Sequence, residues 1–398
     1  MTIAIIGAGL TGASAAVELR EKGYEGDIVL VGAEPHLPYE RPPLSKDILL
    51  GKGTAADAQV KDADWYEQQR IELITGTEVT DLDTAARTFA VDGRRISYDD
   101  LLIATGATSR HLPMVDESGA PFAYLRTVEE SEELKKHLGD SLLIIGAGWI
   151  GMEVAAAARE AGGSVLIAEA AATPLEAAIG PDMAEVLAGL HREHGVDLRT
   201  STTVTAIEHG EGGTRAILSD GEVITPDLVL VAIGAVPTVE LAESAGLAVD
   251  NGILVDARLR TSDEHVYAAG DVANHDHPEH GRLRVEHWDT AIHQGRHAAR
   301  SMLGEQEPYT REPYFFTDQY DLGMEYVGNP GPDGYDEIVI RGDRDTRVLN
   351  ALMLRKGVVV AGMHTNDWDA TDHLRAWVGR EATPKLRDTS VALPDTLT

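Results

Sequence analysis

The sequence of 398 residues contains no cysteine. A chain without cysteine cannot form disulfide bonds, cysteine-ligated metal sites or thiol nucleophiles. Enzyme classes that pass electrons through a cysteine pair, or through a single reactive cysteine, are therefore excluded.

Basic residues are also scarce. The chain has 34 lysine and arginine residues against 66 aspartate and glutamate residues, which gives a net charge of −32. Such an acidic balance argues against nucleic acid and anionic membranes as general partners.

Long apolar runs are missing as well. No stretch approaches the roughly 18 uninterrupted apolar residues needed to cross a bilayer. The N-terminus leads directly into an apolar strand pattern and lacks the basic region and cleavage site of a secretory signal. We therefore expect a soluble, cytoplasmic protein. Its length suggests two or three domains, and a hydrophobic content of 43% is enough to build their cores.

A glycine-rich turn stands at the start of the chain. Apolar residues 3–6 predict a buried strand, and a helical pattern begins a few residues later. Between them lie three glycines in the spacing G-x-G-x-x-G: Gly7, Gly9 and Gly12. In a dinucleotide-binding turn the first glycine makes the bend, the second admits the pyrophosphate and the third lets helix and strand pack closely. A second apolar strand leads to Glu34, roughly 20 residues on, where a carboxylate would meet a ribose hydroxyl.

The same pattern recurs in residues 141–162. An apolar strand is followed by an alanine-rich helix, with three glycines in the same spacing between them: Gly146, Gly148 and Gly151. A further strand leads to Glu169, again roughly 20 residues beyond the turn. Two complete fingerprints in one chain predict two dinucleotide sites.

The segments that follow each fingerprint are also similar. In both halves an antiparallel strand pair precedes a strand ending in glycine, at Gly106 in the first half and at Gly234 in the second. Each half is therefore predicted to be a Rossmann-like α/β domain with a small antiparallel crossover. From residue 313 the pattern changes to antiparallel strands closed by a helix. Residues 392–398 are expected to form a loose tail.

Four histidines lie close together in the last third of the chain: His275, His277, His280 and His287. Their spacing matches no close-set ligand pattern, and acidic residues and a proline interrupt it. We expect a solvated surface loop here and no metal site.

Several segments together carry a resemblance to a known family. They are GAGLTG, YERPPLSK, ATGA, GAGWIGME, AIG, AAGDVA, WDTAIHQG and PYFFTDQYDLGMEYVG. Over nearly its whole length the chain resembles the FAD-dependent NAD(P)H:ferredoxin or rubredoxin reductases. These are the reductase components of bacterial Rieske dioxygenase and cytochrome P450 systems, and they are related to apoptosis-inducing factor and glutathione reductase.

The resemblance implies three domains and two cofactors. FAD would bind a discontinuous domain of residues 1–113 and 240–312. NAD(H) would bind an inserted domain of residues 114–239, and residues 313–398 would form a C-terminal α+β interface domain. The implied fold class is α/β, with two Rossmann-like dinucleotide-binding domains followed by this third domain.

The resemblance also implies roles around FAD. Gly9 and Gly12 would hold the pyrophosphate and Glu34 the adenosine ribose. Asp271 would bind the ribityl chain. Trp288 would begin a helix whose positive end stabilises the pyrimidine ring of the flavin, although it could instead be a buried aromatic without flavin contact. The other positions implied to line this site are Arg41, Lys46, Val79 and Arg126.

Around NAD(H), the implied binding residues are the second glycine turn, Gly234 and Glu169. A carboxylate at position 169 can accept two hydrogen bonds from a ribose diol but repels a 2′-phosphate. Three alanines follow Glu169, so no arginine stands next to it in the sequence. We predict NADH, rather than NADPH, as the electron donor.

Lys46 and Glu153 are the candidate catalytic residues. The resemblance implies an ion pair between them beside flavin N5, where the hydride arrives. The alternative is a carboxylate placed favourably in the first turn of a helix, together with a solvated lysine.

The implied function is hydride transfer from NADH to FAD, followed by one-electron steps to a ferredoxin-type iron–sulfur protein that serves an oxygenase. Ferredoxins are usually acidic, so docking would need a local basic patch, with Arg296 and Arg300 as candidates. Several relatives carry tryptophan where this chain has Phe316, so electron exit through an indole is not assumed. Two alternatives remain open: a redox-gated interaction protein like apoptosis-inducing factor, and a direct reductase of quinones or monodehydroascorbate.

Overall fold

We describe the protein from a computed structural model that covers residues 1–397. The chain forms two compact units. The first unit contains Met1–Arg41, Ala55–Thr108 and Val236–Tyr314, and the second contains Pro42–Thr54, Ser109–Ala235 and Phe315–Thr398. The second fingerprint and the C-terminal strands therefore fall in the same unit. The three-domain division implied by the resemblance stays a prediction.

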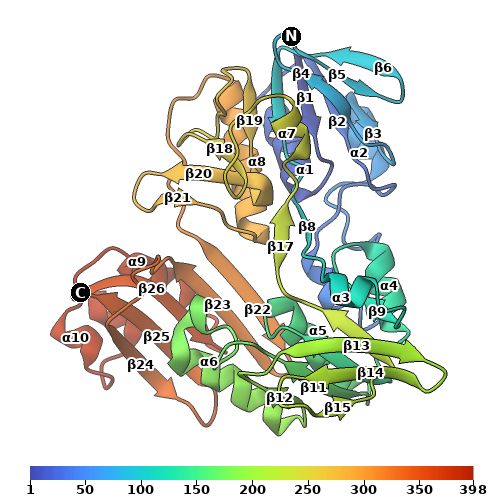
Figure 1. The fold of residues 1–398 in the computed structure, drawn as a ribbon. Helices are drawn as coiled ribbons and strands as arrows, with labels where there is room; N and C mark the ends of the chain where they lie inside the picture. The colour runs from blue at the N-terminus through green and yellow to red at the C-terminus, as the bar shows by residue number, and fades with distance from the viewer. Residues whose placement is uncertain (398) are drawn as a thin grey trace. The chain divides into compact units, whose positions relative to one another are not determined.

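The first unit is built on a parallel sheet of five strands (Figure 1). Its strands, in spatial order, are β19 (Val266–Ala268), β7 (Asp100–Ile103), β1 (Thr2–Ile6), β2 (Asp27–Val31) and β3 (Ile71–Ile74). Apart from Leu73 and Ile74 on the edge strand β3, which are partly buried, their apolar residues are almost completely buried, as expected for a parallel sheet covered on both faces. The strand predicted over residues 3–6 is confirmed as the central strand of this sheet.

Helices and smaller sheets complete the first unit. Helix α1 (Leu10–Glu21) follows the first glycine turn and packs along α8 (Trp288–Met302). The other helices are α2 (Ala63–Gln68), α7 (Glu240–Ser244) and the 3-10 turn η2 (Gly270–Val272). The smaller sheets consist of β4 (Thr80–Asp83), β5 (Thr88–Val91) and β6 (Arg94–Ser97), and of β18 (Ile253–Val255), β20 (Ala273–His277) and β21 (Gly281–Leu283).

The second unit contains a sheet of the same parallel type. Its strands, in spatial order, are β12 (Asp197–Arg199), β11 (Ser164–Ala168), β10 (Ser141–Ile145), β16 (Leu228–Val231) and β9 (Phe122–Ala123). Helix α5 (Trp149–Glu160) follows the second glycine turn, as predicted. The predicted crossover is the antiparallel sheet of β13 (Val204–Gly210), β14 (Gly213–Leu218) and β15 (Val223–Ile224).

Three further helices and a 3-10 turn belong to this part of the second unit: η1 (Pro42–Ser45), α3 (Pro113–Asp116), α4 (Val128–Lys135) and α6 (Glu176–Glu193). Thr127 and Glu130 form a capping box that starts α4. Helix α6 is kinked at Gly180, whose φ is 75°, directly before Pro181. Strands β8 (Ala107–Ser109) and β17 (Ala235–Pro237) pair where the chain passes between the units.

The C-terminal segment of the second unit forms a five-stranded sheet in the order β22 (Tyr314–Gln319), β23 (Leu322–Gly328), β26 (Val358–Thr365), β25 (Val348–Arg355) and β24 (Glu337–Asp343). The pairs that include β24, β25 or β26 are antiparallel, which confirms the predicted change of pattern after residue 313. Helix α9 (Thr371–Trp377) covers this sheet, and α10 (Pro384–Arg387) follows.

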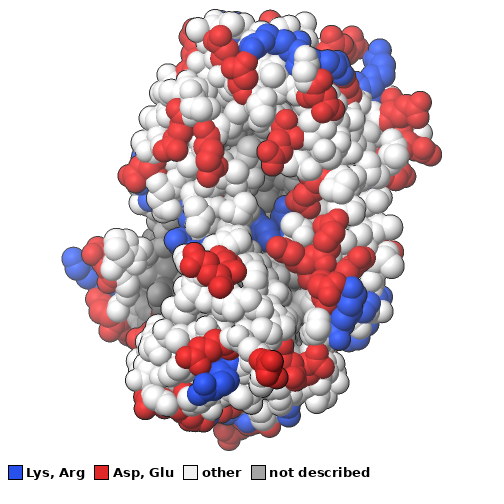
Figure 2. Space-filling view, turned by 45° about the vertical axis from the view of Figure 1, so that its right-hand side comes forward, with Lys and Arg blue, Asp and Glu red and all other residues white. Residues whose placement is uncertain are grey.

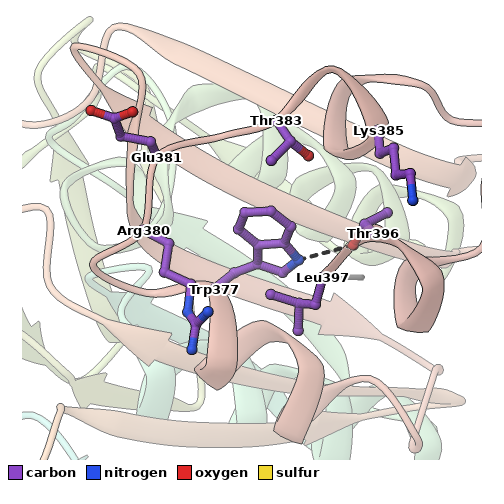
Figure 3. Close-up of a pocket in the computed structure, with 7 residues that line it drawn as sticks. All are labelled: Trp377, Arg380, Glu381, Thr383, Lys385, Thr396 and Leu397. Carbon is purple, nitrogen blue, oxygen red and sulfur yellow. Dashed lines mark hydrogen bonds between the residues drawn. The ribbon is translucent and has the colours of Figure 1, made fainter.

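The prediction of a loose C-terminal tail is wrong for the described residues of that segment. Residues Leu393–Leu397 form the 3-10 turn η3, with Leu393 and Thr396 buried. The Trp377 Nε1–H donates a hydrogen bond of 2.9 Å to Thr396 Oγ1, beside an open cavity of about 580 Å³ (Figure 3). A buried indole N–H needs an acceptor, and the tail supplies one. Thr398 lies outside the described residues.

Acidic side chains spread over much of the face drawn in Figure 2, with fewer basic groups between them, in keeping with the net charge of −32. Among residues 1–397, no helix combines the length and the apolar character that crossing a membrane requires.

Candidate dinucleotide sites and a buried ion pair

The first glycine turn leaves room only where a ligand would need it. Gly7 has a φ of +113°, and a Cβ there would lie 2.0 Å from the carbonyl oxygen of Ala104. A Cβ on Gly12 would lie 2.0 Å from the carbonyl oxygen of Gly7. At Gly9, in contrast, no other atom of the described chain lies within 4 Å of the Cβ position. Gly9 is the N-cap of α1 and has no side-chain cap, so the helix start presents backbone N–H groups to open space.

Glu34 lies just beyond the end of β2 and is held by two donors. The Tyr39 hydroxyl donates to Glu34 Oε2 at 2.5 Å, and Arg41 Nη2 donates to Glu34 Oε1 at 2.6 Å. Burial alone would lower the pKa of Arg41, but Tyr39 and Glu34 together raise it. Because a carboxylate has about four lone-pair sites, Glu34 can still accept from ribose hydroxyls. Val79 lies half-buried against the core of the same unit.

Asp271 and Trp288 belong to this unit too. Asp271 lies in η2, and its charge contributes to the raised pKa of Arg41, which places it near the Glu34 cluster. Trp288 is the first residue of α8, and its Nε1–H donates to Glu40 Oε2 at 2.9 Å. Trp288 is half-buried, and whether it contacts the flavin stays a prediction.

The position of α8 depends on close packing. A Cβ on Gly295 would lie 2.3 Å from the carbonyl oxygen of Thr11 in α1. Gln294 Oε1 accepts a hydrogen bond of 2.9 Å from the backbone N–H of Gly270 in η2. These contacts fix the middle of α8 against α1 and against the η2 turn that contains Asp271. The sequence interpretation missed Gln294 and Tyr39, although both lie inside the segments WDTAIHQG and YERPPLSK.

The second glycine turn repeats the geometry of the first. A Cβ on Gly146 would lie 2.5 Å from the carbonyl oxygen of Ala232, and one on Gly151 would lie 2.3 Å from that of Gly146. At Gly148 the nearest atom is 3.7 Å away. Gly234, with a φ of +97°, has open space at its Cβ position among the described residues, and its carbonyl accepts from the Arg110 N–H. Both turns therefore fit a dinucleotide pyrophosphate.

Glu169 is fixed directly beneath this turn. Its Oε2 accepts from the Ala147 N–H at 2.6 Å and its Oε1 from the Ala171 N–H at 2.7 Å. Arg199, on the neighbouring strand β12, is the arginine that the sequence did not reveal. Its guanidinium is already bound to Asp197 and Glu222, so its charge is compensated.

Lys46 and Glu153 form the predicted ion pair within the second unit. Lys46 Nζ lies 2.6 Å from Glu153 Oε1, and Glu153 is only 6% exposed. Two donors that the sequence did not predict complete the shell: Ser45 Oγ lies 2.5 Å from Glu153 Oε2, and Thr317 Oγ1 lies 2.6 Å from Glu153 Oε1. The alternative of a solvated lysine and a helix-end carboxylate is therefore wrong.

Two phenylalanines at the start of β22 pack differently. The face of the Phe316 ring lies against Lys46, with 5.6 Å between Lys46 Nζ and the ring centroid. Phe315 stacks on Tyr326 at 4.5 Å and contacts Trp149 at 5.0 Å. Phe315 is thus a packing residue, whereas Phe316 adjoins the ion pair.

Three arginines named from the sequence have structural partners. Arg126 lies in the second unit, where its backbone N–H donates to Glu130 at the start of α4. Arg300 lies 2.8 Å from Glu18 on α1, and Arg296 lies 3.5 Å from Glu18 and from Glu21. The expected docking pair therefore joins α8 to α1 instead of forming an uncompensated basic patch. Docking of a ferredoxin at Arg296 and Arg300 stays a prediction. The ion pairs with α1 weaken that prediction, because both guanidinium groups already have acidic partners.

The histidine segment is not the solvated loop that was expected. His275 and His277 lie in β20 and are 2% and 1% exposed, and His297 from α8 is also buried. Rings of His275 and His297 both contact Tyr309. Burial lowers the pKa of His275 and of His297 to about 4. Within residues 1–397, no group of three or more metal-ligating side chains could hold a metal ion.

We expect these histidines to make the first unit sensitive to acid. A histidine in the unfolded chain has a pKa near 6.5 and binds a proton below that pH. In the folded protein, His275 and His297 stay neutral until the pH falls to about 4, so protons favour the unfolded state between these two values. The free energy of unfolding should be unaffected by these histidines above pH 6.5. It should fall by up to about 3 kcal/mol for each of them as the pH drops to 4. Urea unfolding from pH 7.5 to 4.5 measures this. His297→Phe, which keeps a ring against Tyr309, should flatten the dependence, and an unchanged slope would contradict the expectation.

Comparison with known families agrees with this geometry. The family model described as pyridine nucleotide-disulphide oxidoreductase matches residues 1–295, and the model described as reductase C-terminal matches residues 314–397. Rhodocoxin reductase of Rhodococcus erythropolis is 40% identical over 355 residues, which cover 88% of this chain and 83% of that protein. Putidaredoxin reductase of Pseudomonas putida is 39% identical over 352 residues, with coverage of 85% and 82%.

Solved structures show the same likeness over the full length. The crystal structure of the covalent putidaredoxin reductase–putidaredoxin complex matches with a TM-score of 0.94 and 35% identity, covering 100% of this chain and 98% of that one. The ferredoxin reductase for the CYP199A2 system from Rhodopseudomonas palustris matches with a TM-score of 0.92 and 32% identity, covering 100% of both chains. The predicted α/β fold class is thereby confirmed.

Proposed function

Because this chain belongs to the pyridine nucleotide-disulphide oxidoreductase family, we propose that it is an FAD-containing, NADH-dependent reductase. Its electrons pass to a ferredoxin-type iron–sulfur protein that serves an oxygenase. Relatives named as reductases of rhodocoxin, of putidaredoxin and of a dioxygenase system support this. The proposal includes the cytoplasmic location expected from the sequence.

One observation supports the proposal most strongly. The chain contains two glycine turns of matching geometry, and each leaves its middle glycine open while packing tightly at the first and third. One turn accommodates the pyrophosphate of FAD and the other that of NADH. With no cysteine in the sequence, the chain cannot relay electrons through a disulfide.

When bound, FAD accepts two electrons as a hydride and can release them one at a time. The protein supplies position and charge. Gly9 and Gly12 would cradle the pyrophosphate, Glu34 would bind the ribose through its remaining lone pairs, and Asp271 would bind the ribityl chain. The N-terminus of α8 at Trp288 would favour negative charge on the flavin. Arg41 and Val79 would complete the set in the first unit, and the role of Arg126 stays a prediction.

Lys46 and Glu153 are the pair that we propose to assist hydride transfer. Glu153 accepts from Lys46, Ser45 and Thr317, and these contacts hold the ammonium group in one place. A fixed positive charge can stabilise the negative charge that develops as a hydride arrives.

The decisive experiment measures partner dependence. NADH-driven reduction of cytochrome c should be slow with the purified holoprotein alone and fast when a ferredoxin from the same genome is added. Equal rates with and without every ferredoxin tested would contradict a ferredoxin reductase and favour a direct small-molecule reductase. Slow flavin reduction with a long-lived charge-transfer complex would instead favour a redox-gated interaction protein.

We predict that kcat/KM for NADH exceeds that for NADPH by at least about tenfold, which is roughly 1.4 kcal/mol. Glu169 is fixed at the carboxyl end of β11 by the Ala147 and Ala171 N–H groups, where it would repel a 2′-phosphate. Steady-state kinetics with both donors measure the ratio. The double variant Glu169→Ser/Ala170→Arg should narrow the ratio, while Glu208→Ser, at an exposed position on the crossover sheet, serves as a control. Comparable values for both donors in the unaltered protein would refute the assignment.

A further inference from the structure

A line of buried polar side chains leads away from Glu153 inside the second unit. Thr317 and Gln319 lie on β22, and His191 lies on α6. Thr317 Oγ1 is 2.6 Å from Glu153 Oε1, Gln319 Nε2 is 3.1 Å from Thr317 Oγ1, and Gln319 Oε1 is 2.7 Å from His191 Nε2. All three side chains are at most 1% exposed. Burying polar side chains costs free energy even when they are hydrogen-bonded to each other, so this line of buried polar groups needs an explanation.

The hydrogen atoms in this line have one consistent arrangement. An ionised carboxylate only accepts, so the Thr317 hydroxyl must give its single hydrogen to Glu153. Thr317 then accepts from the Gln319 amide, and the amide oxygen accepts from His191. His191 must therefore be neutral, with its hydrogen on Nε2. Its Nδ1 has no hydrogen-bond partner among the described residues, as this tautomer allows.

The orientation of the Gln319 amide decides what Glu153 receives. If the amide were reversed, its oxygen would face Thr317 and would draw the hydroxyl hydrogen away from Glu153. Glu153 Oε1 would then keep only Lys46 as a donor. His191 prevents this reversal because its Nε2–H requires an acceptor at that point.

Ring stacking holds the far end of the line. Tyr320 stacks on His194 with 3.7 Å between ring centroids and an interplanar angle of 13°, and it contacts His191 edge-on at 5.2 Å. His191 lies in the last turn of α6, and His194, three residues on, is its C-cap. The end of β22 and the helix are therefore fixed to each other where Gln319 meets His191.

We propose that Thr317, Gln319 and His191 are positioning residues for the Lys46–Glu153 pair. They keep a hydroxyl hydrogen directed at Glu153 Oε1, and so hold the carboxylate, and the ammonium bound to it, in a single position. No bond is made or broken in the line. The inference deepens the proposed function and rests on it.

The first test removes one donor. Thr317→Val in the FAD-loaded protein should slow the limiting rate of flavin reduction by NADH about tenfold, the size of one hydrogen bond to a charged group, with the dissociation constant of NADH unchanged. Thr317→Ser should restore the rate. Thr396→Val is the matched control, since it removes an equally buried threonine hydroxyl that bonds Trp377 instead. Equal rates for Thr317→Val and Thr396→Val would overturn the proposal.

The second test reverses the polarity at position 319. Gln319→Glu places an acceptor against Thr317, so reduction should be slow at neutral pH and should recover as the new carboxyl group protonates and can donate again. The wild-type ionisable groups around this position are His191 on α6, His194 at its C-cap, the neighbouring Tyr320 and the Lys46–Glu153 pair. Asp318, whose pKa is raised by burial, also interacts with that pair, so each variant is compared with the wild-type pH profile. Gln319→Met offers neither a hydrogen-bond donor nor an acceptor at this position. Flavin reduction in this variant should stay slow at every pH. Identical pH profiles for the two variants would overturn the proposed direction of the hydrogen bond between Gln319 and Thr317.

A third readout needs no turnover. Nitrogen-15 NMR of the histidine rings should show His191 as the neutral Nε2–H tautomer down to low pH, because burial lowers its pKa to about 4. Its signal should change in Thr317→Val and not in Thr396→Val. An Nδ1–H tautomer would overturn the line. Failure of the wild-type protein to be reduced by NADH would instead count against the proposed function, and these spectra would still test the line.

Discussion

Lys46→Met is expected to slow reduction of the bound flavin by NADH about a hundredfold or more, within the range found for well-placed groups that act in proton and charge transfer. The substitution removes the charge and keeps much of the length of the side chain. Glu153 remains 6% exposed and keeps only the Ser45 and Thr317 hydroxyls as donors. A buried charge that loses its partner also costs stability, about 3 kcal/mol. Stopped-flow absorbance of the flavin and urea unfolding measure the two effects.

The control for this variant is Lys136→Met. Lys136 pairs with Glu133 on the surface of α4, where both side chains are more than 60% exposed. Such a pair contributes little, so both flavin reduction and stability should stay close to wild type. The double variant Lys46→Met/Glu153→Gln should recover part of the lost stability without recovering the rate. A single variant Lys46→Met that is reduced at the wild-type rate would remove the pair from the mechanism.

Gly9→Ala is expected to abolish tight FAD binding and leave the apoprotein folded. Apart from residue 9 itself and its two chain neighbours, no atom of the described chain lies within 4 Å of the new Cβ, and the φ of Gly9 is −84°, which alanine adopts freely. The methyl group would therefore occupy only space that the proposed assignment gives to the pyrophosphate. Bound FAD is measured by absorbance after gel filtration, and the fold by circular dichroism and the unfolding midpoint.

Two further glycines make this prediction specific. Gly148→Ala, at the matching position of the second turn, should weaken NADH binding while FAD stays bound. Gly12→Ala should instead destabilise the fold itself, since its Cβ would lie 2.0 Å from a backbone oxygen. If Gly9→Ala retained FAD, or if Gly148→Ala lost it, the assignment of the cofactors to the two turns would be incorrect.

The parts of the fold that local pattern determines could be predicted from the sequence. Buried parallel strands read as continuous apolar runs, and the glycine spacing fixes the bends after β1 and β10. The same reasoning brought out Glu34 and Glu169 as carboxylates at strand ends. It could not show that Tyr39 and Arg41 bind Glu34, because that depends on how the chain turns between residues 34 and 41. Nor could it show that Arg199 is compensated, because one of its partners, Glu222, lies 23 residues away.

The Lys46–Glu153 pair shows where prediction depended on resemblance. These residues are 107 positions apart, and nothing in composition or periodicity joins them. Ser45 and Thr317 were missed although they stood in the quoted segments. The sequence predicts a loose C-terminal tail and a solvated histidine loop, whereas tertiary packing buries Thr396, His275 and His277. Burial of a polar side chain depends on partners that the local sequence does not contain.

The way the chain threads its two compact units has a consequence for its resistance to proteolysis. The chain passes from one unit to the other after Arg41, Thr54, Thr108, Ala235 and Tyr314. A cut at any single loop therefore leaves at least one unit assembled from both fragments. A nicked molecule should migrate as an intact particle in gel filtration and separate only in denaturant. Neither dinucleotide turn can be released with its whole unit as one continuous fragment, so loss of either site by proteolysis would require unfolding or several cuts.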